Sequence, residues 1–186
     1  MKRTIIFAMA LVATLVASAQ TKSYKVGDLY DEAGLRGVVF EVTNDGQHGK
    51  IVSAEQTSDW IKWCIRSARE VKLEMSSRDN GRANTLNMRK VEDLEDWQTQ
   101  FPVYAWVRSL GNDAWYLPAV EEAVVLARVS AQVNATLEKN GYKKLYYYLW
   151  TSTEENGDMW MIDTTYADTY LDSKGGLFNA RAIARF

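Results

Sequence analysis

The sequence predicts an α+β fold in which both ends of the chain are brought to one sheet. Runs of β-forming residues fill the first and last thirds of the chain, and helical patterns fill the middle. Removing a nineteen-residue leader from the 186 residues leaves 167, a length that suits one domain burying about 70% of its unfolded surface. No linker, low-complexity segment or internal repeat interrupts the sequence. We therefore expect a single domain over residues 20–186.

Residues 1–19 have the pattern of a secretory signal peptide. Lys2 and Arg3 give a positive start, residues 5–16 form an apolar run, and residues 17–19 read Ala-Ser-Ala, a cleavage signal. The run is too short for a membrane span, for which about 18 apolar residues are needed. No Cys follows the cleavage signal, so a lipid anchor has no attachment point. We expect an exported protein of the periplasm, the outer surface or the extracellular space.

Composition argues against several classes of partner. The formal charge of −2 becomes −4 when the two cations of the leader are removed, and no basic patch remains that would favour nucleic acid or an anionic membrane. No later segment is apolar enough for a transmembrane helix. Seven Trp and ten Tyr can fill a core, or they can line a site for a sugar or a peptide.

The reactive residue types are scarce. Cys64 is the single cysteine, so it cannot form an internal disulfide, and we expect a small buried residue there. His48 is the single histidine and lies in a turn pattern, where we expect it to face water. A cysteine nucleophile needs a nearby base, and zinc needs several ligands, so neither site is predicted. We expect no cofactor and no metal.

The first third predicts strands. Residues 24–30 (YKVGDLY) suggest a short strand before a turn, and residues 37–42 (GVVFEV) form a strong β run. Residues 44–46 (NDG) signal a turn, after which residues 49–54 (GKIVSA) return as a second strand. The last two runs therefore predict a β-hairpin with a loop longer than two residues.

The middle of the chain predicts helices. Residues 60–73 are ambiguous between strand and helix, residues 84–94 look helical, and residues 101–110 form a short helix that starts at Pro102 and stops at Gly111.

The longest helix is expected over residues 119–140. Pro118 lies at its first turn, Glu121 and Glu122 complement the helix dipole there, and Gly141 ends it. Alanines, valines and leucines recur at spacings of three and four along this segment, which predicts one broad apolar stripe packed on a sheet or another helix.

The last third returns to strands. Residues 145–150 (LYYYLW), 159–163 (MWMID) and 180–186 (ARAIARF) have strand composition. In residues 180–186, Ala182, Ala184 and Phe186 alternate with Arg181, Ile183 and Arg185. The two sets are therefore expected on opposite faces of the strand.

Four short motifs resemble one family. Residues 76–85 read SSRDNGRANT, similar to the DGxxNT segment of secreted bacterial domains of the Lcl C-terminal type. Residues 115–122 read WYLPAVEE, residues 150–154 read WTSTE and residues 180–186 read ARAIARF, each similar to the family's motif in the same order. The resemblance covers roughly residues 24–186. Residues 119 and 123 are alanines where the family often has Ser and Leu.

The resemblance implies a C-type-lectin-like fold, distantly shared with formylglycine-generating enzymes. Such a fold has a small, twisted, mixed or antiparallel sheet, flanking helices, and adjacent N- and C-terminal strands. The paired cysteines of animal lectins and their calcium-coordinating triplets are absent here, so lectin calcium does not carry over. The two active-site cysteines of the enzymes are absent too, because Cys64 is single and too early in the chain.

The WTSTE segment has two interpretations. In the structural one, Trp150 and Trp160 fill the core, the hydroxyls of Ser152 and Thr153 bond nearby backbone groups, and Glu154 pairs with Arg181 or Arg185. In the functional one, the polar side chains bind a ligand, with neighbouring aromatic residues stacking on it. Residues 164–178 are then the best candidate for an exposed aromatic and polar rim. The candidate ligand-binding residues are Ser152, Thr153, Glu154, Tyr166, Tyr170 and Phe178.

These observations favour an exported, non-catalytic binding or adhesion module that recognises a glycan, a peptide or a partner protein. One alternative is a structural subunit of a cell-envelope or surface-appendage assembly. Another is a hydrolase-type enzyme, which would need Glu154 and Asp158 to line one cleft. Asp158, Asp163, Asp168 and Asp172 are spaced along strands and turns, where carboxylates usually face water, and they do not predict a calcium site. No catalytic residue is predicted.

Overall fold

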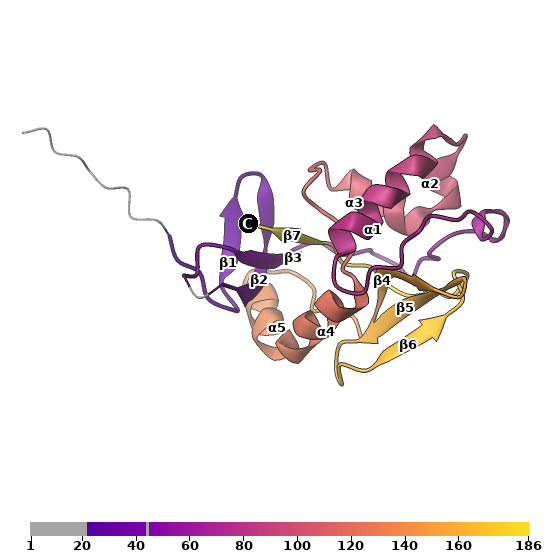
Figure 1. Ribbon diagram of the computed structural model, residues 1–186. Helices are drawn as coiled ribbons and strands as arrows, with labels where there is room; N and C mark the ends of the chain where they lie inside the picture. The colour runs from indigo at the N-terminus through magenta and orange to yellow at the C-terminus, as the bar shows by residue number, and fades with distance from the viewer. Residues whose placement is uncertain (1–21, 44) are drawn as a thin grey trace, which may run out of the picture.

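The computed structural model describes residues 22–43 and 45–186, and it has an α+β fold with two antiparallel sheets and several helices (Figure 1). The proposed signal peptide lies outside the described residues. The elements in chain order are β1 (Leu29–Glu32), β2 (Leu35–Val42), β3 (Gly49–Ser53), η1 (Arg66–Ala68), α1 (Gly81–Met88), η2 (Arg89–Asp93), α2 (Trp97–Gln100), α3 (Pro102–Ser109), α4 (Val120–Arg128), α5 (Ser130–Lys139), β4 (Tyr148–Glu155), β5 (Asp158–Asp163), β6 (Thr169–Asp172) and β7 (Ile183–Arg185).

The first sheet joins the two ends of the described chain. Its order is β1-β2-β3-β7, and β7 pairs antiparallel with β3, with Ala184 opposite Ile51. The last strand therefore shares a sheet with the first three, as predicted, but its neighbour is β3, and β1 lies at the opposite edge. The ring of Phe186 still reaches the opening segment, with its centroid 4.8 Å from that of Tyr30 and 5.3 Å from that of Tyr24.

The second sheet, β4-β5-β6, was only partly predicted. The hairpin of β4 and β5 was expected from the runs at residues 145–150 and 159–163, but β4 begins later, at Tyr148, and continues through WTSTE. β6 falls in the segment expected to be a rim loop. Its sequence, TYLD, is short and lacks a clean alternation of polar and apolar residues. Pairing with β5, and not local propensity, therefore makes it a strand.

The longest predicted helix is two helices. At Val129 the backbone has φ −112° and ψ 15°, so α4 ends and α5 begins at Ser130. The break turns α4 towards β5 and α5 towards β2. A continuous apolar stripe cannot reveal it, because both helices bury that stripe.

Other element boundaries differ from those predicted. The helix expected over residues 84–94 begins earlier, at Gly81, and ends as the 3₁₀ turn η2. The stretch over residues 60–73, which was ambiguous between strand and helix, is irregular apart from η1, and α2 was not predicted. The first strand begins at Leu29 and not at Tyr24. The short helix after Pro102 is confirmed as α3, and Gly111 follows it with φ +72°.

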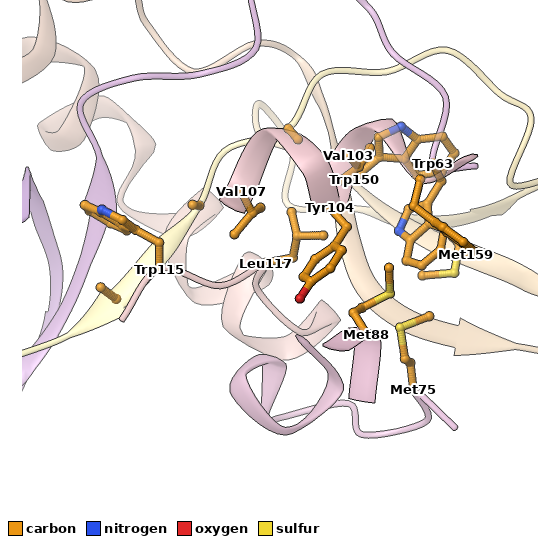
Figure 2. Packing of buried hydrophobic residues seen from close by; sticks show 14 of the residues in the cluster. Trp63, Met75, Met88, Val103, Tyr104, Val107, Trp115, Leu117, Trp150 and Met159 are labelled. Atoms are coloured by element: carbon orange, nitrogen blue, oxygen red, sulfur yellow. The ribbon is translucent and has the colours of Figure 1, made fainter. Parts of the chain in front are cut away.

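Both faces of the first sheet are buried. Val39, Ile51 and Ala184 face a large core, whereas Val38 and Ile183 face a smaller core under α4 and α5. The large core continues to the second sheet, where Trp63, Trp150, Met75, Met88 and Met159 pack together (Figure 2). The expectation that Ile183 lies on the face opposite Ala184 is confirmed, and both faces prove to be interior.

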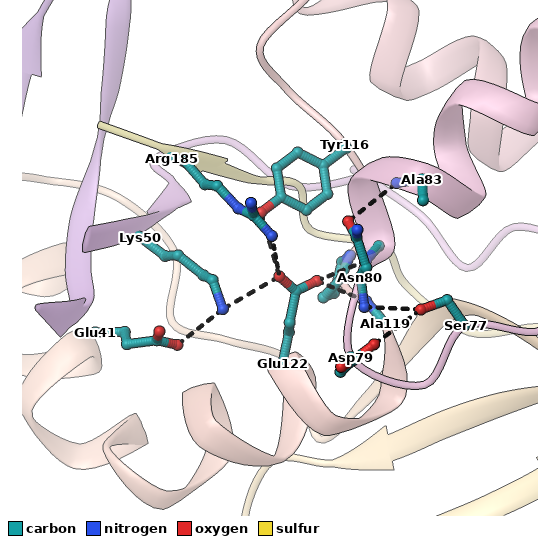
Figure 3. A network of polar contacts seen from close by, with 12 residues as sticks. Glu41, Lys50, Ser77, Asp79, Asn80, Ala83, Tyr116, Ala119, Glu122 and Arg185 are labelled. Carbon is teal, nitrogen blue, oxygen red and sulfur yellow. Dashed lines mark hydrogen bonds and ion pairs between the residues drawn. The ribbon is translucent and has the colours of Figure 1, made fainter. Parts of the chain in front are cut away.

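Glu122 lies where the two sheets and two helices meet (Figure 3). Its side chain is 2% exposed. One carboxylate oxygen accepts from the backbone N–H groups of Gly81 and Ala119, at 3.0 and 3.1 Å. The other lies 3.2 Å from Lys50 Nζ on β3 and accepts from the Tyr116 hydroxyl at 3.3 Å. One carboxylate thus ties the starts of α1 and α4 to the first sheet.

The surroundings of Glu122 leave little freedom. Gly81 has no room for a side chain, because a Cβ there would lie 2.2 Å from the carbonyl oxygen of Leu117 and 2.5 Å from the nitrogen of Ala119. Burial, followed by the Glu122 charge, raises the pKa of Tyr116 above its ordinary value, so its hydroxyl keeps the proton that it donates. Arg185 on β7 adds a cation 3.9 Å from the carboxylate.

Replacing Glu122 with Ala should lower the free energy of unfolding by about 3–5 kcal/mol, because the change leaves two buried N–H groups without their acceptor and leaves the mostly buried Lys50 with Glu41 as its remaining carboxylate partner. Urea denaturation followed by tryptophan fluorescence measures the change. Glu121→Ala is the matched control: Glu121 is exposed and next in sequence, so its loss should cost about 1 kcal/mol or less. Equal losses for the two variants would contradict the role assigned to Glu122.

Candidate functional site

An open apolar groove lies at the start of β4. It has a volume of about 410 Å³, and three separate segments of the chain line it. Six of the seven lining residues are aromatic or aliphatic, and the seventh is an amide. They are Trp60, Tyr146, Tyr147, Tyr148, Leu177, Phe178 and Asn179.

Backbone hydrogen bonds hold the segment around Phe178 in place. Phe178 and Ile61 exchange two backbone bonds, at 2.9 and 3.3 Å, and Trp150 N–H donates to Asn179 O at 2.8 Å. The Asn179 amide donates to Thr57 Oγ1 at 3.1 Å and to Asp59 O at 3.0 Å. The groove wall is therefore fixed between β4 and the 57–61 loop before any ligand arrives.

The floor of the groove is formed by aromatic rings that pack edge to face. The ring of Phe178 is 4.7 Å from Trp150 and 6.1 Å from Tyr148, edge to face in both cases. Trp150 is fully buried, and its indole N–H donates to Ile61 O at 2.8 Å. Phe178 thus rests on the core, and its remaining exposed surface faces the groove.

The rim of the groove is exposed to an unusual degree. Trp60 is 68% exposed and Tyr147 71% exposed, with Tyr148 and Leu177 about half exposed beside them. Isolated apolar residues on a surface are ordinary, but a contiguous group of large ones marks a binding surface. Trp and Tyr bring large contact areas with few rotatable bonds, so little conformational entropy is lost when they bind.

The three predicted rim residues separate in the structure. Phe178 lines the groove. Tyr170 lies opposite Met161, which lies opposite Trp150, so Tyr170 shares a sheet face with the groove residue Tyr148 but stands two strands away. Tyr166 is 75% exposed on the turn between β5 and β6 and does not line the groove.

Ser152 and Thr153 are buried and bond to the protein itself. Ser152 Oγ lies 3.2 Å from Pro118 O, to which it donates, and accepts from the amide of Asn84 at 3.3 Å. Thr153 Oγ1 donates to Ser77 O at 2.9 Å and accepts from Val120 N at 3.0 Å, at the start of α4. These hydroxyls have the structural task that the first interpretation of WTSTE gave them.

The motifs that carried the family resemblance converge here. The side-chain amide of Asn84, from SSRDNGRANT, accepts from the backbone N–H of Ser77 at 3.1 Å and donates to the carbonyl oxygen of Ser77 at 2.7 Å. Thr85 Oγ1 accepts from Leu117 N of WYLPAVEE at 3.1 Å. The ARAIARF segment adds Arg185 near Glu122. Polar residues far apart in sequence therefore form one network around the first turn of α4.

Glu154 does not pair with either predicted arginine. Its carboxylate lies 3.0 Å from Nζ of Lys174, whose side chain is buried. Arg181 instead donates to the carbonyls of Ala54 at 2.6 Å and Lys143 at 3.1 Å, and burial lowers its pKa to about 9, so it stays charged at neutral pH. The sequence indicated that Glu154 would pair with a cation, but it did not indicate that Lys174 would be the partner.

A second cavity, of about 420 Å³, lies beside Glu154. The 69–76 loop and the turn at Asn156 and Gly157 line it together with Glu154. Asp158 is not among its lining residues, so this cavity does not join the two carboxylates that the enzyme hypothesis requires.

The remaining reactive residues take ordinary places. Cys64 is fully buried and His48 is exposed in a turn, as predicted. Among residues 22–43 and 45–186, no group of three or more His, Cys, Asp or Glu side chains is placed to hold a metal ion. Asp163 is buried, and its carboxylate accepts from the N–H groups of Thr165 and Tyr166, at 2.7 and 3.2 Å.

No protein-family model matches the chain, and no curated protein matches it. Within the described part of the chain, no helix is both long and apolar enough to cross a membrane.

Replacing Thr153 with Val should lower the free energy of unfolding by about 1–3 kcal/mol, because the nearly isosteric change leaves Val120 N without an acceptor in the interior and removes one of the two donors to Ser77 O. Thermal and urea unfolding measure the loss. Thr165→Val, at an exposed turn position, is the control and should change stability by about 0.5 kcal/mol or less. If Thr153→Val left the stability unchanged, the structural role of this hydroxyl would be contradicted, and Thr153 would again be a candidate for ligand binding.

Cys64 should resist alkylation in the folded protein. Burial raises the pKa of its thiol to about 11, so roughly a thousandth of it is thiolate at pH 8, and reagents cannot reach it. Iodoacetamide labelling followed by mass spectrometry should detect little product at pH 8 without denaturant and complete labelling in guanidinium chloride. Rapid labelling of the native protein would show that this part of the core opens.

Proposed function

We propose that the chain is an exported, non-catalytic binding module that holds a partner polypeptide in its aromatic groove. One observation carries the proposal: Trp60, Tyr147, Tyr148 and Leu177 stand exposed together over a floor that the core keeps rigid. A surface of this kind loses apolar area from water when a partner covers it, which drives association. Export rests on the pattern of residues 1–19.

The chemistry of the lining favours an apolar or aromatic side chain over a sugar. A sugar needs hydrogen-bonding groups placed around its ring as well as a stacking surface. Asn179 is the one amide in the lining, and its NH₂ group is already used by Thr57 and Asp59. The other six residues offer ring faces, aliphatic surface and, from the tyrosines, hydroxyls at the rim.

A C-type-lectin-like fold is the finer form of the proposal. Its support is the network around the first turn of α4, to which all four family-like motifs contribute, and the place of β7 in the sheet of β1 to β3. Fold similarity alone does not assign a function, because one fold hosts many functions. Ser152 and Thr153 bond within the protein and Glu154 lies beside Lys174, so these three residues are not proposed as ligand contacts.

Replacing Trp60 or Tyr147 with Ala should weaken peptide binding by about tenfold or more, since such exposed aromatic residues are typical interface hot spots. The probes are peptides selected from a random displayed library against the full chain, and fluorescence anisotropy gives their Kd. Both side chains are exposed, so the free energy of unfolding should change by about 0.5 kcal/mol or less.

Tyr166→Ala is the matched control, because Tyr166 is as exposed as Tyr147 but lies outside the groove. It should leave the Kd unchanged. A parallel glycan array tests the other ligand class: glycan binding that is lost in the Trp60 and Tyr147 variants, together with a failure to select peptides, would replace the polypeptide by a carbohydrate. Equal effects of all three variants would remove the groove as the site.

A further inference from the structure

Strand β6 leaves one edge of the second sheet open. The sheet order ends at β6, and within the described residues β5 is the only strand or helix that packs along it extensively. Figure 1 shows β6 as the outermost strand of this sheet, with no element beyond it. The opposite edge is covered, because β4 bonds there to Pro118 O, Met75 O and Asn179 O.

The register shows which groups of β6 face outward. Asp163 N–H donates to Asp168 O at 2.8 Å, so these two residues form a hydrogen-bonded pair. Such pairs alternate along an antiparallel ladder, so Tyr170 and Asp172 also bond to β5. The N–H and C=O groups of Thr169 and Leu171 therefore point away from the sheet, free to bond to another strand.

Natural proteins usually protect an edge of this kind with lysine, proline or a bulge. β6 has none of these: its sequence is TYLD, and its four residues pair with β5 without a register shift. The chain segment that contains it carries charge of one sign, and Arg78 contributes a cation over Trp160 on the neighbouring strand. Residues 151–173 contain six carboxylates and no Lys or Arg, and Asp168 and Asp172 flank the outward-facing groups.

The structure assigns this edge to an extended, lysine- or arginine-bearing segment of a partner polypeptide, which adds to β6 as a fourth strand. Main-chain hydrogen bonds at Thr169 and Leu171 would hold the segment, and Asp168 and Asp172 would select its basic side chains. A second copy of the same edge is disfavoured as the occupant, because pairing β6 with β6 would bring these carboxylates together.

This inference goes beyond the aromatic groove. The groove lies at the β4 side of the sheet, and β5 separates it from β6. A partner could use one surface without the other, so each proposal can fail alone.

The test uses a fluorescently labelled hexapeptide of alternating Val and Lys, titrated into the full chain at low salt. The unlabelled controls for competition are the same peptide N-methylated at every residue and a Val-Glu version. The plain peptide should bind, and each control should compete about tenfold less well or worse, because one lacks N–H donors and the other reverses the charge. On binding, the amides of Thr169 and Leu171 should become protected from hydrogen exchange.

Leu171→Pro should abolish binding, because it removes an outward N–H that the native sheet does not use, and edge strands tolerate proline there. Leu171→Ala keeps the N–H and is its matched control; binding should stay within about threefold. If the proline variant fails to fold by circular dichroism, Asp168→Lys with Asp172→Lys replaces it and should abolish binding of the Val-Lys peptide.

Trp60→Ala separates the two proposals, since it should leave binding of the Val-Lys peptide unchanged. Competition by the N-methylated peptide at full strength, full binding by a folded Leu171→Pro variant, or no binding of the plain peptide would overturn the assignment of the edge.

Discussion

A buried carboxylate needs cations and N–H groups as partners. In this protein the partners of the Glu122 carboxylate come from separate helices and strands, so this requirement determines how those elements meet. Glu122 accepts from the first residues of two helices and pairs with Lys50 of the first sheet, so α1, α4 and β3 are held at one point. Removing α1 or β3 would take a partner away from this buried charge and so destabilise it. The second sheet is attached at the same place, because Thr153 of β4 bonds to Val120, two residues before Glu122.

The polar motifs of the sequence therefore hold the fold together, and the aromatic groove that we propose as a binding surface lies next to them. WTSTE places Trp150 beneath Phe178, and the three tyrosines that precede it along the chain form the groove. The structural and functional interpretations of that segment thus apply to neighbouring residues. Its hydroxyls hold backbone groups, whereas the exposed rings beside it are free to meet a partner.

Local patterns predicted the elements that local chemistry decides. The apolar run of β2 and the Pro102 start of α3 are found where expected. Long-range contacts decided the rest: β6 is a strand because β5 pairs with it, and the break at Val129 lets α4 pack on both sheets while α5 packs on β2. The groove could be predicted only through Phe178, since Trp60 and the tyrosines at 146–148 become neighbours only in the folded chain.

The pairing of β3 with β7 also has a consequence for the order of events in folding. About 130 residues separate the two strands, so their pairing closes a long loop and costs more chain entropy than pairing strands that are adjacent in sequence. Until β7 pairs with β3, one edge of β3 is unpaired. Ala182 and Ala184 are then missing from the large core, and Ile183 is missing from the smaller core. A newly made chain therefore cannot complete its first sheet or either core until its last strand has been synthesised.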